Sequence, residues 1–143
     1  MGRRNAREPE ATGTLGSLMS GLTLDTGGLT ALDRNDRRIV ALLARAAQTS
    51  APITVPATAL AQAVRRPERQ VRLARLVRQP TTNVLPLDRV DATSVGRLLV
   101  ASGTSDIVDA HVVICGRRSG HRVVTSDPGD LRRLDPEIQV IEI

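Results

Sequence analysis

The chain of 143 residues contains no phenylalanine, tyrosine or tryptophan, no lysine, and only one cysteine. Without aromatic side chains the core must form from leucine, valine, isoleucine and alanine, and binding platforms that stack nucleic-acid bases on aromatic rings are excluded. The single Cys115 excludes an internal disulfide and a cysteine-rich metal site. Because lysine is absent, the 20 positively charged side chains are all arginines.

Long hydrophobic runs are also missing. No stretch approaches the roughly 20 consecutive apolar residues of a membrane span, and no apolar segment follows the first arginines as in a secretory signal. The 41% hydrophobic and 24% charged residues are typical of a globular protein. We therefore expect a soluble cytoplasmic protein without membrane association. The net charge of +5 favours an anionic partner, with nucleic acid held through its phosphates as the leading candidate.

The first 20 residues differ in composition from the rest of the chain. They are rich in glycine, arginine, threonine and serine without periodicity, which predicts a disordered tail before a domain over residues 21–143. Met19 lies just before the first expected strand, so translation could start there rather than at Met1. Mass analysis of the native N-terminus decides between the two starts.

From residue 22 onward, short apolar runs alternate with helix-like segments. This alternation predicts a three-layer α/β/α fold with a mainly parallel sheet of four to five strands. We expect strands at residues 22–25, 53–55, 83–87, 122–125 and 138–143. We expect helical segments at residues 28–32, 36–47, 57–65, 67–78, 88–100, 106–117 and 128–134.

Four aspartates are placed where such a fold gathers side chains at one edge. Asp25 and Asp127 each follow an expected strand, and Asp106 and Asp109 open an apolar, buried helix. Ligands of an open parallel sheet bind beyond the carboxyl ends of its strands. With no lysine nearby, such a cluster favours a hard cation, Mg²⁺ or Mn²⁺.

Structural roles compete with this interpretation. Asp106 and Asp127 are suitable helix N-caps, and Asp25 could shape a turn. His111 and Cys115 are expected in the core. A solvated position is expected for His121, and an exposed turn position for Asp130. The helix at 67–78 has arginines on one half and apolar residues on the other, which favours an ordinary solvated face over a phosphate-binding stripe. That arginine half consists of Arg69, Arg72, Arg75 and Arg78.

Four segments of the chain come in the order of a PIN domain. They are Leu24-Asp25-Thr26-Gly27-Gly28, Val55-Pro56-Ala57-Thr58, Thr104-Ser105-Asp106-Ile107-Val108-Asp109-Ala110-His111 and Val124-Thr125-Ser126-Asp127. Together they resemble the VapC-type toxins of bacterial toxin–antitoxin pairs, over nearly the whole chain after residue 20. The resemblance implies a Mg²⁺-dependent ribonuclease of the PIN fold. It also implies a homodimer, and a small antitoxin whose C-terminal segment lies over the site.

The resemblance assigns roles to single residues. Asp25 matches the first family acid, Asp106 the third and Asp127 the fourth. Asp109 matches an extra acid that many members carry one turn later. A hydroxyl that helps to position the metal or its water is matched by Thr125 or Ser126.

The second family acid is absent from the chain. It is normally a glutamate in the helix after Val-Pro-Ala, and Gln62 stands in that region instead. Glu68 lies beyond Pro67 and is not expected to replace it. A glutamine keeps an oxygen ligand but removes a negative charge, so metal affinity should fall.

Metal-assisted hydrolysis of an RNA phosphodiester fits this residue set. A Mg²⁺ held by Asp25, Asp106 and Asp127 would lower the pKa of a bound water and orient it toward the scissile bond. The main alternative, which Gln62 favours, is a weakened PIN scaffold that binds RNA or a protein partner without cutting. A metal-free interaction domain is a further alternative. A response-regulator receiver needs a lysine that this chain lacks.

Overall fold

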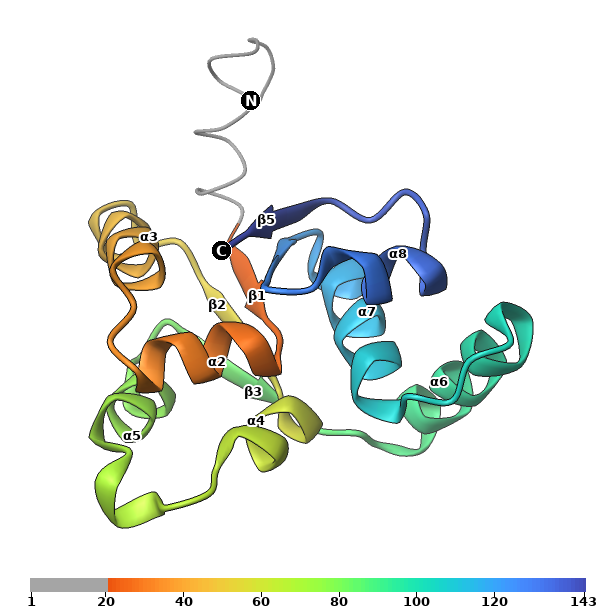
Figure 1. Cartoon of the computed structure of the whole chain (residues 1–143), viewed down its shortest axis with the longest axis horizontal. Helices are drawn as coiled ribbons and strands as arrows, with labels where there is room; N and C mark the ends of the chain where they lie inside the picture. Colours follow the sequence, from red (N-terminus) through yellow and green to blue (C-terminus); the bar gives the residue numbers. More distant parts are fainter. Residues whose placement is uncertain (1–20) are drawn as a thin grey trace, which may run out of the picture.

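The computed structural model describes residues 21–143, in which a five-stranded parallel sheet lies between two layers of helices (Figure 1). The strand order is β3-β2-β1-β4-β5, and every neighbouring pair is parallel. The strands are β1 (Leu22–Leu24), β2 (Ile53–Pro56), β3 (Thr82–Leu85), β4 (Arg122–Thr125) and β5 (Val140–Glu142). The predicted three-layer fold is therefore confirmed. The expected tail and the alternative start at Met19 lie outside the described residues.

The helices divide between the two faces of the sheet (Figure 1). One layer contains α2 (Thr26–Asp33), α3 (Arg37–Gln48) and α5 (Val71–Arg78). The other contains α6 (Arg89–Ser102), α7 (Ile107–Ser119) and α8 (Pro128–Leu134). The short α4 (Ala57–Ala63) follows β2 and contacts both α2 and α7, so it joins the two layers at the carboxyl edge of the sheet.

The central strands are buried on both faces, which is the usual pattern for parallel sheets. In β1 and β4, Leu22, Leu24, Val123 and Val124 are fully buried. Helix α7 packs against β1, β2 and β4 and is buried on nearly all sides, as its apolar sequence predicted. Among residues 21–143 no single helix is long and apolar enough to cross a bilayer. Helices α6 and α7, which are separated by a sharp bend, are long and apolar enough for a span only when they are counted together.

Two helix boundaries differ from the sequence predictions for identifiable reasons. Helix α2 begins at Thr26, earlier than expected, because the Asp25 carboxylate accepts a hydrogen bond from Gly28 N (2.8 Å) and caps it. The predicted continuous helix at 67–78 is broken into a 3₁₀ turn, η1 (Pro67–Arg69), and α5. The break is at Gln70, whose backbone is not helical.

The buried side chain of Gln70 explains the break. Its Oε1 accepts from the backbone N–H groups of Arg65 (2.9 Å) and Arg66 (3.0 Å), and its Nε2 donates to Ala63 O (2.9 Å) and Asp33 Oδ2 (3.2 Å). These bonds satisfy the two backbone N–H groups, and they also satisfy Ala63 O, whose helical partner four residues later would be Pro67, which has no N–H to donate. They are also why α4 ends at Ala63 rather than at residue 65.

Candidate functional site

The carboxyl ends of β1 and β4 lie side by side because these strands pair, with Leu24 opposite Val124. Asp25 directly follows β1, and its backbone N–H donates to Val124 O (3.2 Å). Thr125 ends β4, and Ser126 and Asp127 follow it. Two of the four predicted acids are thus at neighbouring strand ends, as the topology argument required.

Asp25 is the most buried of these carboxylates, with 7% of its surface exposed. Burial raises its pKa above the ordinary value, and the nearby Asp127 adds to that effect. Hydrogen bonds from the Thr125 hydroxyl and from the backbone N–H groups of Gly28 and Gly27 act in the opposite direction. The site therefore desolvates this carboxylate and supplies donors that favour its charged form.

The turns after β1 and β4 approach each other closely. A side chain at Gly27 would collide with Ser126 Oγ in its present position, so the Ser126 side chain would have to shift to admit a larger residue there. In the second turn, Asp127 N donates to Thr125 Oγ1 (2.9 Å), which places the buried Thr125 hydroxyl between Asp127 and Asp25. Ser126 is exposed beside them.

Asp106 and Asp109 enter the same region from the start of α7. The Asp106 carboxylate caps the helix by accepting from Asp109 N (2.9 Å). The half-buried Asp109 has its pKa raised to about 6, first by burial and then by the charges of four other aspartates. Those four are Asp106, Asp130, Asp25 and Asp127. The charges of these four aspartates therefore act on Asp109 at this edge of the sheet, and Asp106 and Asp130 line the same hollow as Asp109.

Asp130 is the member that the sequence placed at an exposed turn, from which it could reach only the rim of the site. In the structure it lies in the first turn of α8 and lines a hollow of about 280 Å³ together with Asp106 and Asp109. Its partner Arg133 (3.2 Å) is largely exposed, so their ion pair is weak. The signal in the sequence was its position three residues after Asp127, across one helical turn. We refer to Asp25, Asp106, Asp109, Asp127 and Asp130 as the acidic edge.

Gln62 reaches the same edge from α4. Its Oε1 accepts a hydrogen bond from Thr26 Oγ1 (2.7 Å), and Thr26 directly follows Asp25. The residue that stands in the region of the missing family glutamate therefore lies beside the acidic edge. Its position agrees with the sequence-based placement.

The donor set suits a hydrated hard cation better than a closed protein cage. Within residues 21–143, no three His, Cys, Asp or Glu side chains are grouped closely enough to hold a metal ion by themselves. Mg²⁺ is usually bound through one or two carboxylates and keeps several waters. A divalent cation would also relieve the repulsion that raises the pKa of Asp109. The chemistry of these oxygens therefore fits Mg²⁺.

The other titratable candidates have structural roles. His111 and Cys115 are fully buried in α7, as predicted, and His111 Nδ1 is 2.7 Å from Thr58 Oγ1. Burial raises the pKa of the Cys115 thiol to about 12, which excludes a thiolate nucleophile at neutral pH. The prediction of a solvated His121 was wrong. Its ring is half-buried beside Gly21, where burial lowers its pKa.

No protein-family model and no curated protein matches this sequence. The chain is similar to the crystal structure of FitAcB from Neisseria gonorrhoeae, with a TM-score of 0.59 and 17% identity over 85% of this chain and 96% of that chain. It is also similar to FitAB bound to the IR36 DNA fragment, with a TM-score of 0.59 and 16% identity over 85% of this chain and 94% of that chain. At these identities the likeness shows the fold, and it confirms the PIN-like architecture that the motifs predicted.

Proposed function

We propose that this protein is the toxin of a toxin–antitoxin pair and acts in the cytoplasm as a Mg²⁺-dependent endoribonuclease. The observation that carries the proposal is the convergence of five carboxylates at the carboxyl edge of a parallel sheet. The likeness to FitAcB and FitAB supports a toxin-type PIN fold.

Each residue of the site has a distinct part in the proposal. Asp25, Asp106 and Asp127 would hold the metal, one or two of them directly and the rest through its bound waters, and Asp109 would add charge beside them. When bound, Mg²⁺ (or Mn²⁺ in its place) supplies an activated water and neutralises charge on the phosphate oxygens. The Thr125 hydroxyl favours the ionised form of Asp25, against the effect of burial on its pKa, and accepts a hydrogen bond from the backbone N–H of Asp127. The exposed Ser126 hydroxyl is available to hold a water.

A catalytically weakened scaffold is the second candidate, and Gln62 is the observation that favours it. A glutamine beside Asp25 and Thr26 contributes no charge to the site, so the metal is held less tightly than by a glutamate. Such a protein would bind RNA or a partner without cutting it. Cleavage measured with and without chelator separates the two candidates.

Asp25→Asn tests the nuclease directly. An asparagine still caps α2 by accepting from Gly28 N, so the protein should fold, as far-UV circular dichroism would show. Loss of the carboxylate should lower Mg²⁺-dependent cleavage of a fluorescently labelled single-stranded RNA by more than about 100-fold. Cleavage that equals wild type, or that persists in EDTA, would remove Asp25 and the metal from the mechanism.

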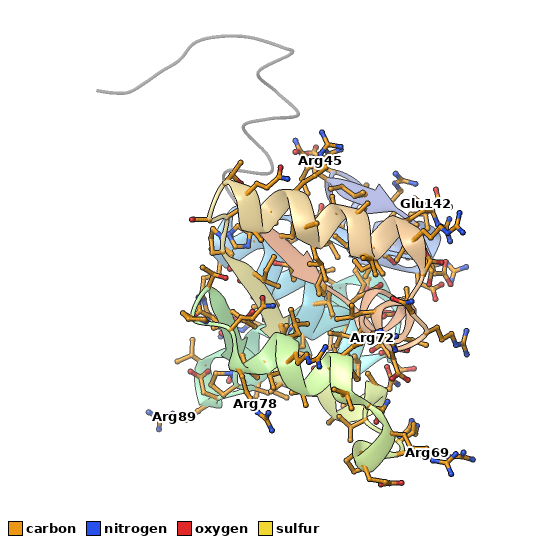
Figure 2. The ribbon with its side chains drawn as sticks, turned by 90° about the vertical axis from the view of Figure 1, so that its left-hand side faces the viewer. Arg45, Arg69, Arg72, Arg78, Arg89 and Glu142 are labelled. Carbon is orange, nitrogen blue, oxygen red and sulfur yellow. The ribbon has the colours of Figure 1, made fainter. Side chains whose placement is uncertain are left out.

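A surface on one layer of helices suits the antitoxin. Helices α2, α3 and α5 enclose a hollow of about 340 Å³, and Figure 2 faces this side of the molecule, with α3 above α5. Its floor includes Val40, Leu43 and Leu76, and its rim carries Arg72 and Arg75. An apolar helix with acidic flanks complements this surface in shape and charge. We propose that a small partner of this chemistry docks there and extends over the acidic edge.

Co-expression with the short reading frame beside this gene tests the partner. Val40→Asp places a charge in the hollow and should weaken the complex, because Val40 is 40% exposed on its surface. Val100→Asp is the matched control, since Val100 is 84% exposed on α6, in the other layer. Equal capture by both variants would place the partner elsewhere. Light scattering on the same samples tests the proposed homodimer.

A further inference from the structure

Six arginines lie on the segment that connects α4 to the end of α5. They are Arg65, Arg66, Arg69, Arg72, Arg75 and Arg78, and we call them the arginine track. All six are exposed, and none forms an ion pair within residues 21–143. Glu68 is the only acidic residue between the first and the last of them.

Ordinary surface helices usually intersperse acidic and basic residues, which gain from pairs one turn apart. Helix α5 contains no acid, and Arg72, Arg75 and Arg78 follow one another at three-residue spacing. Like charges at this spacing repel and weaken the helix. Leu73 and Leu76 anchor the opposite side of α5 in the core, so the arginines are held outward. An anionic ligand relieves the repulsion without disturbing the core.

The track is fixed relative to the acidic edge by Gln70. This buried side chain accepts from Arg65 N and Arg66 N and donates to Ala63 O and Asp33 Oδ2, so the connection after α4 has one defined path. Arg65 is three residues beyond Gln62, which is bonded to Thr26 beside Asp25. The track therefore starts three residues after a side chain that lies beside the acidic edge, and it continues along α5. Figure 2 shows Arg69, Arg72 and Arg78 spread along this side.

We propose that the arginine track binds the sugar-phosphate backbone of single-stranded RNA and leads it to the acidic edge, an inference that rests on the proposed nuclease function. Guanidinium groups bind phosphate through two parallel hydrogen bonds, which suits a track built only of arginine. The eight residues of α5 extend about 12 Å, enough for contacts with several oxygen atoms of the strand. Binding through phosphates also agrees with the absence of aromatic residues for base stacking.

The experiment compares two triple variants of the full chain that lose the same charge. The track variant is Arg69→Gln, Arg72→Gln, Arg75→Gln, and the control is Arg45→Gln, Arg97→Gln, Arg132→Gln, which removes exposed arginines from α3, α6 and α8. Fluorescence anisotropy measures binding of a labelled 20-nucleotide single-stranded RNA in EDTA, across a series of salt concentrations. EDTA prevents metal-dependent cleavage, so binding is measured alone.

For the track variant we expect the Kd to rise at least roughly tenfold. The slope of the logarithm of the binding constant against the logarithm of the salt concentration should become less steep by about 2, since each of the three lost phosphate contacts contributes about 0.7. The control should change Kd less than about twofold. Equal weakening in both variants would overturn the track, because it would show only a general effect of net charge. Tighter binding of a DNA duplex of the same length, lost in the track variant, would overturn the assignment to RNA.

This result is separable from the nuclease proposal. If wild type binds RNA through the track but never cleaves it with Mg²⁺, the proposed activity fails and the binding surface stands. If wild type cleaves RNA and the track variant binds and cleaves equally well, the track is wrong and the nuclease stands.

Discussion

The acidic edge and the arginine track are opposite in charge and are built in opposite ways. The five carboxylates come from residues 25 to 130 and meet only because the sheet places β1 beside β4 and α7 beside both. The six arginines come from one stretch of 14 residues, 65–78. The first region therefore depends on the complete fold, whereas the second depends mainly on a local turn and helix.

Among the described residues, only four ion pairs form, and just one of them, between Asp130 and Arg133, involves either region. Asp91 is buried and bound by Arg118, with Arg118 Nη1 2.7 Å from Asp91 Oδ2, and Asp135 pairs with Arg117 (3.2 Å). Those pairs satisfy charges that the fold partly buries. Like charges gathered with few such partners weaken the folded state, so we expect ligands of opposite charge to stabilise both regions.

The largest effect should come from removing one acid while leaving its structural role in place. Asp106→Asn keeps a side-chain oxygen that caps α7 but loses the charge, so cleavage should fall by more than about 100-fold. RNA binding in EDTA should be unchanged or slightly tighter, because the track is intact. Asp88→Asn is the control, since Asp88 caps α6 by the same bond, from Asp91 N (2.8 Å). A comparable loss in Asp88→Asn would mean that activity follows helix capping and not the acidic edge.

Gln70→Ala tests whether the track depends on its buried anchor. The change leaves two backbone N–H groups and one carbonyl without their partner, so the free energy of unfolding should fall by about 2 kcal/mol. Urea unfolding followed by far-UV circular dichroism measures it, since the chain has no tryptophan for fluorescence. RNA affinity should fall several-fold in the variant under folding conditions. Gln79→Ala, at the exposed end of α5, should change neither quantity.

Gln62→Glu sharpens the acidic edge by adding the charge that the site lacks. Mg²⁺ or Mn²⁺ affinity, measured by calorimetry, should rise roughly tenfold because one more carboxylate faces the ion. Cleavage at limiting Mg²⁺ should rise with it. The matched control is Gln48→Glu, which adds the same charge at the end of α3. If cleavage and affinity are no higher in Gln62→Glu than in this control, Gln62 is not part of the metal site.

The smallest effect concerns the pH dependence of the metal-free protein. The pKa of Asp109 is raised to about 6, so the folded state binds this proton more tightly than the unfolded chain does. Ionised Asp109 therefore destabilises the fold above pH 6, and the effect is relieved as the pH falls toward the ordinary value of 3.8. Asp109→Asn should be more stable than wild type at pH 7.5 by on the order of 1 kcal/mol, discounted for partial exposure.

Thermal unfolding in EDTA at pH 7.5 and 4.5 measures this difference, which corresponds to about 3 °C at the higher pH and should shrink to roughly a third of that at the lower. His111 and His121 have lowered pKa values, so they destabilise both proteins in acid. Their contribution cancels when the variant is subtracted from wild type. A difference that is constant with pH would mean that the Asp109 carboxylate is not under repulsion.

Much of the fold was predictable because it depends on patterns that are local in sequence. Apolar runs ended by Asp25 and Asp127 marked two strands, and parallel topology then placed both acids at one edge. The sequence also predicted the burial of α7 and of its His111 and Cys115 side chains. What it could not supply were contacts between distant segments. The break at Gln70 depends on Asp33 and Ala63, and the half-burial of His121 depends on the path of Gly21.

The same limit applies to the site. Asp130 joined the acidic edge because α8 packs against α7, and its spacing from Asp127 alone could not reveal that contact. Gln62 could be placed in the correct region, but its bond to Thr26 required the approach of α4 to α2. Long-range packing therefore decides which residues of a correctly predicted fold actually meet.

The hydrogen bond between Thr26 and Gln62 has a further consequence, which a glutamate at position 62 would not have. With its oxygen engaged by the threonine hydroxyl, the glutamine offers two amide hydrogens, and within residues 21–143 no acceptor is bonded to them. A glutamate there could only repel a passing phosphodiester, whereas these hydrogens attract it. If the protein is the proposed nuclease, we expect Gln62 to bind the metal ion less tightly than a glutamate would and to bind the substrate strand more tightly.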